Sequence, residues 1–191
     1  MSKPQAPKPA KLVIGVLMKD TRLFGELATE LSSRFGPPDL ISAWLPFDYT
    51  SYYAEEMGAP ICRRLMAFKV LIQQEALAGI KIITNDLELE YCRNDKRRVN
   101  IDPGYLVPER FVLASGKNFT HRIYIGQGIY ADLTLIYQKG AFRELPWTYP
   151  DYADEPILGF LAQVRRKYLV DLRLNETTAV SGPDGPNDTF F

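Results

Sequence analysis

The strongest constraint on the fold is the order in which strand-like and helix-like spacings of apolar residues follow one another along the chain. Leu12 to Met18 is a short apolar run whose length fits a buried strand, and helix-spaced apolar residues follow from Leu23 to Phe35. Asp20 is suited to cap this helix. Gly36-Pro37-Pro38 is suited to end it, because glycine accepts the conformation just past a helix and proline cannot continue one. We therefore predict a strand followed by a helix at the start of the fold.

Two further strands, a second helix and a fourth strand come next. Leu40 to Phe47 reads as a strand, and Arg63 to Ile72 alternates in a way that predicts a strand with one buried face. Gln73 to Tyr91 has helical spacing, and Arg97 to Asp102 is the fourth strand. The predicted apolar stripe of the second helix consists of Ala76, Ile80, Ile83, Leu87 and Tyr91. The order β-α-β-β-α-β predicts a ferredoxin-like core, an antiparallel sheet with two helices on one face.

More strands and a last helix follow this core. Asp102-Pro103-Gly104 is a turn signal, and Phe111 to Ala114 is a further short strand. His121 to Ile125 and Ile129 to Tyr137 form a predicted hairpin around Gly126-Gln127-Gly128. Pro156 suits the first turn of the final helix, whose predicted stripe is Ile157, Leu161, Val164 and Tyr168. The predicted fold class is α+β, with a C-terminal hairpin and a final helix added to the core.

The two ends of the chain differ in composition from the middle. Residues 1–10 are rich in Lys and Pro, and residues 173–191 are rich in Gly, Pro, Asp and Thr, so we predict two disordered tails around a single domain at 11–172. The start lacks an apolar secretory segment, and no run approaches about 18 consecutive apolar residues. Cys62 and Cys92 have no CxxC partner, and we interpret them as small buried side chains. We expect a cytoplasmic protein that does not enter a membrane.

Several function classes are excluded by what the sequence lacks. Lys plus Arg and Asp plus Glu both number 23, whereas binding to nucleic acid through phosphate neutralisation usually shows as a basic excess. No phosphate-binding GxxxxGK[ST] loop, GxSxG nucleophile elbow or HExxH zinc motif is present. His121 is the single histidine, which excludes any mechanism or metal site that needs two. We therefore do not expect a nucleic-acid-binding protein or an enzyme of these classes.

A dense group of polar residues marks a candidate site between Arg97 and Asp132. Asp102 and His121 are the candidate catalytic pair, because a carboxylate can fix the tautomer of an imidazole that titrates near neutral pH. The candidate ligand-binding residues are Asn100, Lys117, Arg122, Tyr130 and Asp132. The alternative interpretation is structural, with a carboxylate that caps its own turn and ion pairs across a hairpin. A divalent ion held by Asp102 and Asp132 is a third interpretation, although oxygen-only sites leave no clear spacing signature.

Three other polar or aromatic sets have two interpretations each. Lys81, Asn85 and Glu88 share one helix face and either add a carboxylate to the site or form a solvated helix edge, which we favour. Arg63-Arg64 and Lys96-Arg97-Arg98 either hold a phosphate or simply flank strands. The aromatic segment from Trp147 to Tyr152 either covers a sheet edge, as we favour, or forms the wall of a ligand site.

Three segments of the chain carry a resemblance to a known family: Asn100-Ile101-Asp102-Pro103-Gly104-Tyr105-Leu106, His121-Arg122-Ile123-Tyr124-Ile125-Gly126 with Gly128-Ile129-Tyr130-Ala131, and Leu145-Pro146-Trp147-Thr148-Tyr149-Pro150-Asp151-Tyr152. They resemble a bacterial family labelled domain of unknown function 4416. Gly15 in the first strand and the segment from Pro46 to Gly58 are similar too. The resemblance covers nearly everything from Lys11 to Tyr168, and it departs at Asp132, where we expect Glu in relatives. It implies one compact domain and no particular reaction.

Two hypotheses about function follow from these residues. The first is a small enzyme or ligand-binding protein for a phosphorylated or otherwise anionic small molecule, based on the Asp, His, Arg and Lys cluster. The second is a non-catalytic module that binds a protein partner through aromatic residues, which concentrate in Tyr49 to Tyr53 and Trp147 to Tyr152. A cleft that gathers Asp102, His121 and Arg122 favours the first, and an exposed apolar patch favours the second. Neither a cofactor nor a metal is implied by a motif.

Overall fold

A computed structural model describes residues 1–50 and 52–180 of the chain, with side chains to Leu174. Its β-strands are β1 (Ala10–Met18), β2 (Pro38–Ile41), β3 (Leu45–Phe47), β4 (Ile61–Ile72), β5 (Val99–Val107), β6 (Arg110–Ser115), β7 (Arg122–Gly126), β8 (Ile129–Gln138) and β9 (Ala141–Glu144). The α-helices are α1 (Phe24–Phe35), α2 (Tyr52–Met57), α3 (Leu77–Glu90) and α4 (Glu155–Val180), and the short 3-10 helices are η1 (Thr21–Leu23), η2 (Gln74–Ala76) and η3 (Pro150–Ala153).

The described strands form one nine-stranded sheet in which every neighbouring pair is antiparallel. The strand order is β2-β4-β1-β5-β6-β8-β7, while β3 also pairs with β4 and β9 with β8. The fold is therefore α+β, as the sequence predicted. The sheet extends beyond the four strands of the predicted core, since β6 to β9 continue it from β5.

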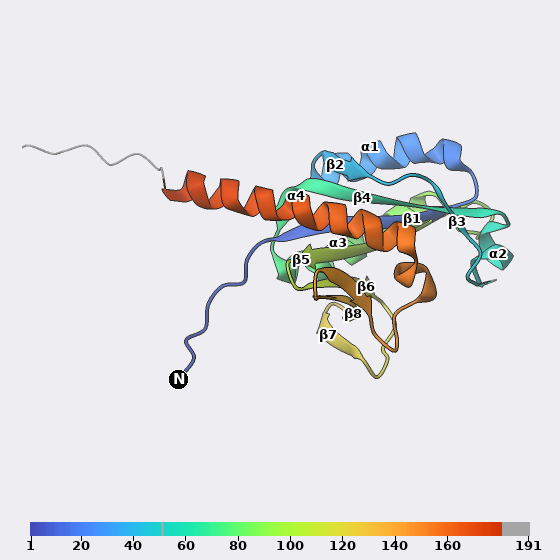
Figure 1. Cartoon of the computed structure of the whole chain (residues 1–191). Coiled ribbons are helices and arrows are strands. Elements are labelled where there is room, and N and C mark those ends of the chain that lie inside the picture. Colours follow the sequence, from blue (N-terminus) through green and yellow to red (C-terminus); the bar gives the residue numbers. More distant parts are fainter. Residues whose placement is uncertain (51, 181–191) are drawn as a thin grey trace, which may run out of the picture.

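Helices cover both faces of the sheet (Figure 1). Leu27 and Leu31 of α1 and Ile80 and Leu87 of α3 are buried in one core with alternate residues of β1, β4 and β5. On the opposite face, α4 lies along the sheet, and its predicted stripe from Ile157 to Tyr168 is fully part of a second core. This arrangement leaves the central strands β1 and β4 between two layers of helices.

Burial on both faces corrects the prediction for β4. The alternation from Arg63 to Ile72 indicated one buried face, but the consecutive residues Leu65 to Phe68 are all fully buried. Met66 and Phe68 pack toward α1 and α3, whereas Leu65 and Ala67 pack in the core that contains α4. The apolar residues on both sides of the strand are needed because α4, from a distant part of the sequence, covers the second side.

The predicted strand from Leu40 to Phe47 is two strands, β2 and β3, which both pair with β4. Between them, the Ser42 hydroxyl accepts a hydrogen bond from the Leu65 amide at 3.0 Å, and the Ser42 amide donates to the Leu65 carbonyl at 2.9 Å. A side-chain oxygen therefore replaces a backbone carbonyl at this point, and the regular strand pairing is interrupted there.

Asp102-Pro103-Gly104 is not a turn, because all three residues lie inside β5. Pro103 fits there because its ring nitrogen has the same orientation as the Ile101 amide, which points away from β1. Gly104 is required by close packing, since a Cβ atom at this position would lie 2.5 Å from the Val112 carbonyl oxygen of β6. The predicted turn was wrong, because these residues lie within β5 at the point where its pairing with β6 begins.

Two further boundaries differ from the sequence predictions. Ala10 is buried in β1, so the regular structure begins one residue before the predicted domain, and residues 1–9 have no helix or strand. The last helix continues to Val180, past the predicted boundary at 172, while residues 181–191 of the predicted tail lie outside the described residues. Gly36 ends α1 with a φ of 84°, as the Gly-Pro-Pro signal predicted.

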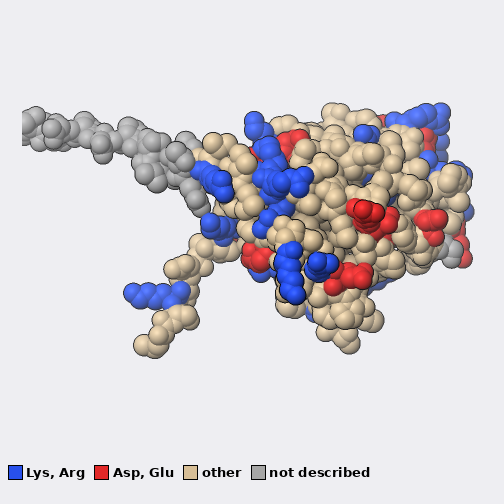
Figure 2. All heavy atoms as spheres, in the orientation of Figure 1, with Lys and Arg blue, Asp and Glu red and all other residues tan. Residues whose placement is uncertain are grey.

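The surface and the helices give two observations on possible binding partners. Basic and acidic side chains are interspersed over the face that carries α4 (Figure 2). Among the described residues, none of the helices combines the length and the apolar character that a membrane crossing requires.

Candidate functional site

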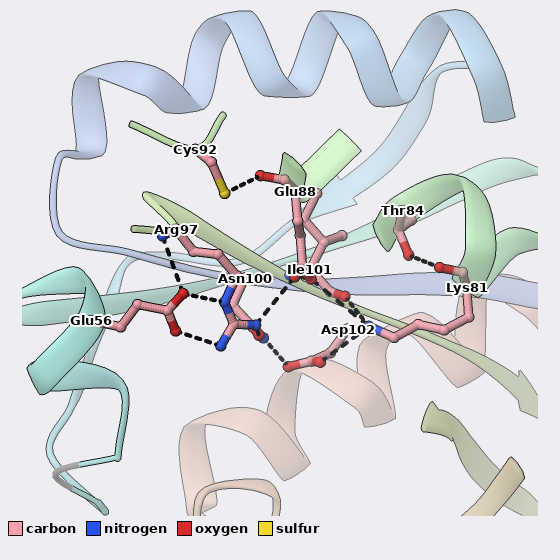
Figure 3. A network of polar contacts seen from close by, with 9 residues as sticks. All are labelled: Glu56, Lys81, Thr84, Glu88, Cys92, Arg97, Asn100, Ile101 and Asp102. Atoms are coloured by element: carbon pink, nitrogen blue, oxygen red, sulfur yellow. Dashed lines mark hydrogen bonds and ion pairs between the residues drawn. The ribbon is translucent and has the colours of Figure 1, made fainter. Parts of the chain in front are cut away.

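The candidate site lies where β5 and β6 separate. β6 pairs with β5 only from Gly104 to Val107, so the first half of β5 has β1 on one side and none of the described strands on the other. Two side chains of α3 take the place of that strand (Figure 3). The Ile101 amide donates to Oε1 of Glu88 at 2.7 Å, and Nζ of Lys81 donates to the Ile101 carbonyl at 2.7 Å. The opening in the sheet is therefore closed on one face by buried charged residues.

A cavity of about 630 Å³ opens at this point. Its walls come from β5, α3, the segment that follows β6, the tyrosine-rich segment before α2, and η3. This volume lies within the range of about 300–1,000 Å³ that is typical of small-molecule sites. Segments far apart in the sequence thus build one pocket lined by charged and tyrosine side chains.

Arg63 of β4 is a buried residue of the pocket lining. Its guanidinium lies between the rings of Phe47 and Tyr152, with centroid distances of 5.1 and 4.6 Å, and forms an ion pair with Asp151. Burial raises the pKa of Asp151, although Arg63 opposes this effect, and burial also raises the pKa of Tyr152. Within the described part of the chain, Nε of Arg63 and the Tyr152 hydroxyl have no hydrogen-bond partner. This region therefore holds donors that its own neighbours do not use.

A second group of charges connects α2, α3 and β5 (Figure 3). Arg97 binds Glu56 through Nη2 at 2.7 Å and Nε at 2.8 Å, and its Nη1 lies 3.3 Å from Glu88 and 3.2 Å from the Asn100 side-chain oxygen. The hydrogen bonds from Arg97 lower the pKa of Glu56, whereas burial raises the pKa of Glu88. Arg97 thereby fixes α2, and the tyrosines that it carries, against the start of β5.

The structure brings five of the predicted site residues to this pocket. They are Asn100, Asp102, Lys117, Arg122 and Asp132. Asn100 donates to Asp102 at 2.8 Å, and Lys81 and Arg63 lie 3.8 and 3.9 Å from the Asp102 carboxylate. Lys117 lies over the ring of Tyr52 at 4.9 Å. Five of the seven polar residues predicted from this part of the sequence therefore line one pocket.

His121 and Tyr130 do not line the pocket. His121 Nε2 lies 3.2 Å from the buried Asp132 carboxylate, and its ring stacks on Trp147 at 5.0 Å. The predicted pairing with Asp102 is wrong in this respect, because the polar contacts of Asp102 involve Asn100, Lys81 and Arg63. Tyr130 faces Tyr124 across the β7–β8 hairpin instead, with 5.4 Å between ring centroids.

Asp132 and Arg122 form a buried ion pair in the pocket wall. Nε of Arg122 donates to Asp132 at 2.9 Å, and its other nitrogens donate to the Ser115 hydroxyl, the Lys117 carbonyl and the Tyr149 hydroxyl at 2.8–3.0 Å. Nearly all donors of this guanidinium are therefore committed to protein groups. Arg122 holds the segment that follows β6 in place rather than offering a free charge.

Tyr53, Arg63, Asp151 and Tyr152 are among the pocket residues that were not part of the predicted site. The charge of Arg63 on the same strand face as the apolar Leu65 and Ala67 was a usable signal. Lys81 and Glu88 are buried in the lining, so the favoured interpretation of a solvated helix edge was wrong for them. In the segment from Trp147 to Tyr152, Trp147 and Thr148 donate hydrogen bonds to the Leu133 and Thr134 carbonyls of β8, whereas Tyr149 to Tyr152 line the pocket. The segment therefore has features of both interpretations.

The structure gives no support to the divalent-ion interpretation. Asp102 faces Lys81 and Arg63, and Asp132 faces Arg122 and His121, so both carboxylates already neutralise cationic neighbours. Within residues 1–50 and 52–180, no three His, Cys, Asp or Glu side chains are grouped in a way that could hold a metal ion.

Comparisons with known proteins give one match. A family model described as a domain of unknown function, DUF4416, matches residues 8–168. Searches of curated proteins and of solved structures found no match. The matched residues include all the strands of the sheet, the pocket and most of α4. The chain therefore belongs to the DUF4416 family.

Proposed function

We propose that this protein binds a small anionic molecule, such as a phosphate ester, in the pocket between β5 and β6. The observation that carries the proposal is the convergence of cationic side chains from five separate segments on one cavity. These side chains are Arg63, Lys81, Arg97, Lys117 and Arg122. Such clusters favour anionic ligands, because charge-assisted hydrogen bonds to carboxylates and phosphates are stronger than neutral ones.

Lys117 is the residue that we expect to contact the anionic group. The other four cations each have a carboxylate within 4.0 Å, whereas Lys117 takes part in none of the ion pairs found among the described residues. Lysine is a common phosphate ligand because its ammonium is a compact charge on a flexible stem. An incoming anion therefore meets one cation whose charge is not already compensated.

The proposal is for binding, and the residues suggest no particular reaction. The expected acid–base pair of Asp102 and His121 is not formed, since His121 is stacked on Trp147 behind the wall. Asp102 remains in the pocket as a carboxylate that can accept hydrogen bonds from a ligand.

A thermal-shift screen of phosphate esters and their dephosphorylated counterparts tests the proposal. We expect phosphate esters to raise the Tm of the wild type, because a ligand that binds only the folded state stabilises it. Lys117→Ala should lose most of this shift, and Lys69→Ala, an exposed lysine of β4 outside the pocket, should keep it. Equal shifts in wild type and Lys117→Ala, or no shift with any anion, would contradict the proposal.

A second candidate function is a protein-interaction module that uses the pocket-mouth aromatics. Tyr49, Tyr52 and Tyr149 are all exposed, and all three line the cavity. Tyrosines at such positions are typical of interfaces, since they combine an apolar ring with a polar tip. This candidate predicts that no small molecule shifts the Tm and that Tyr52→Ala abolishes a protein interaction in cells.

We also propose a finer fold assignment and a location. The order β2-β4-β1-β5, with antiparallel neighbours and with α1 and α3 on one face, supports a ferredoxin-like unit that β6 to β9 extend. Cys62 and Cys92 are both free thiols, which supports a location in the reducing cytoplasm. Fractionation of cells that express the chain would test the location.

A further inference from the structure

We infer that the ligand is a nucleoside phosphate, bound with its phosphate at Lys117, its ribose hydroxyls at Asp102 and its base among the pocket-mouth tyrosines. This inference rests on the proposed function and adds the class of ligand. It uses three features of the pocket that a bare anion would leave without partners.

Asp102 is the first feature. Four carboxylates line the pocket, and three of them are buried and committed to protein partners: Glu88 to the Ile101 amide, Asp132 to Arg122, and Asp151 to Arg63. Asp102 keeps 25% of its side chain exposed and accepts only one hydrogen bond of the described residues, from Asn100. A carboxylate has room for several donors, and the neighbouring hydroxyls of a ribose are suited to it.

Lys81 and Arg63 explain why a carboxylate is compatible with a pocket that binds an anionic molecule. They lie 3.8 and 3.9 Å from the Asp102 carboxylate, which is close enough to offset its charge but longer than a direct hydrogen bond. Asp102 therefore keeps its acceptor sites for the ligand without repelling a phosphate bound elsewhere in the cavity.

The tyrosines at the mouth are the second feature. Tyr49, Tyr52 and Tyr149 expose 40%, 57% and 50% of their surface. The hydroxyl of Tyr49 donates to Asp154 at 2.6 Å, and that of Tyr149 accepts from Arg122 at 2.8 Å, so these rings are held by their polar tips. Fixed aromatic rings with exposed surface are a favourable environment for a nucleobase, which stacks on them.

The segment that follows β6 is the third feature. The Lys117 amide donates to the Ser115 hydroxyl at 3.2 Å, and Arg122 binds the Lys117 carbonyl, so the backbone that carries this lysine is fixed. A Cβ atom at Gly116 would meet no other atom within 4 Å, so there is open space beside the backbone that precedes Lys117. A phosphate group fits beside such a fixed cation and backbone.

Together the three features select among anionic ligands. Inorganic phosphate would use Lys117 alone. A sugar phosphate would use Lys117 and Asp102 but would leave the exposed tyrosine rings in water. A nucleoside phosphate uses all three, and a cavity of about 630 Å³ has room for a molecule of this size.

Titration calorimetry of the full chain with nucleoside monophosphates, their 2′-deoxy forms, ribose 5-phosphate and inorganic phosphate tests the inference. We expect the best nucleoside monophosphate to bind about tenfold more tightly than ribose 5-phosphate, because stacking of one base contributes this much. The 2′-deoxy form should bind about tenfold more weakly than the ribonucleotide, because one hydrogen bond to a charged group is lost.

Variants locate each contact. Asp102→Asn should remove the preference for the ribonucleotide, and Asp86→Asn, an exposed carboxylate of α3 outside the pocket, should keep it. Tyr49→Leu should reduce the advantage over ribose 5-phosphate, and Tyr124→Leu on β7, outside the pocket, should not. The comparison of ligands on the wild type stands even where a variant does not fold.

The outcomes separate the two proposals. Ribose 5-phosphate that binds as tightly as every nucleotide overturns this inference and leaves the proposed function standing. Equal affinity for ribo and deoxy forms, or an unchanged preference in Asp102→Asn, also overturns it. If no phosphate compound binds at all, both proposals fail.

Discussion

At the scale of single residues, the most consequential interaction in the pocket wall is the buried pair of Asp132 and Arg122. Both side chains are almost completely buried, and the carboxylate accepts from Nε of Arg122 at 2.9 Å. Removing one member of a buried pair leaves an uncompensated charge, which costs about 3–5 kcal/mol. Asp132→Ala should lower the free energy of unfolding by that amount in urea denaturation. Asp86→Ala is the exposed control, and an equal effect of the two changes would show that the pair does not stabilise the fold.

Glu88 gives a residue-scale prediction about pH. Burial raises the pKa of Glu88 above its ordinary value of 4.5, so between these two values the folded state binds more protons than the unfolded state. This contribution to stability is present at low pH and is lost as the pH rises through the folded-state pKa. Compared with Glu88→Gln, the wild type should therefore become relatively more stable as the pH falls from neutral toward the ordinary pKa of 4.5.

The measurement is urea denaturation of both proteins across this pH range, with Glu144→Gln on the exposed part of β9 as the matched control. A difference between wild type and Glu88→Gln that stays constant, or that grows with rising pH, would contradict the assigned environment of Glu88.

Some residues of the site could be identified from the sequence, and others could not. Asn100 and Asp102 were identifiable because residues two apart on a strand share a face, and both line the pocket. Lys117, Arg122 and Asp132 were identifiable because polar residues are frequent in this part of the sequence. The partner of His121 was not, because it depends on how β7 and β8 pair and on where Trp147 comes to lie.

At the scale of elements, α3 offers a test of the orientation of the helix. The predicted stripe contained both Ile83 and Leu87, but Ile83 is 40% exposed and Leu87 only 1%. Leu87→Asp should abolish cooperative unfolding or lower stability by about 4 kcal/mol or more, since it buries an unpaired charge. Ile83→Asp should change stability by only about 0.5 kcal/mol. Thermal melts followed by circular dichroism would measure both, and similar losses would mean that the helix packs with a different face.

The elements that the sequence predicted best are those with local signals. The α1 helix ends at Gly36, the hairpin turns at Gly126 to Gly128, and α4 packs through the stripe from Ile157 to Tyr168, as their patterns indicated. The sequence prediction ended β5 at Asp102, just before Pro103, because proline usually breaks a central strand. It is tolerated here because β6 has already separated from β5, and that separation depends on tertiary packing.

At the scale of the whole molecule, the pocket is built from segments between Phe47 and Tyr152. The opening exists because two strands of one sheet diverge and α3 supplies Lys81 and Glu88 to the exposed strand edge. No single stretch of the sequence contains this site, which explains why no local phosphate-loop or metal-site motif marks it. The fold class was predictable from segment order, while the convergence of the charges required the three-dimensional arrangement.

A crystal structure of the protein grown with a mixture of phosphate esters, including nucleoside monophosphates, tests the central claim most directly. The account predicts one bound molecule in the cavity between β5 and β6, with its phosphate within hydrogen-bond distance of Nζ of Lys117. A phosphate ester bound only outside this cavity, or crystals of the same mixture with none bound, would contradict the claim that this pocket is the functional site.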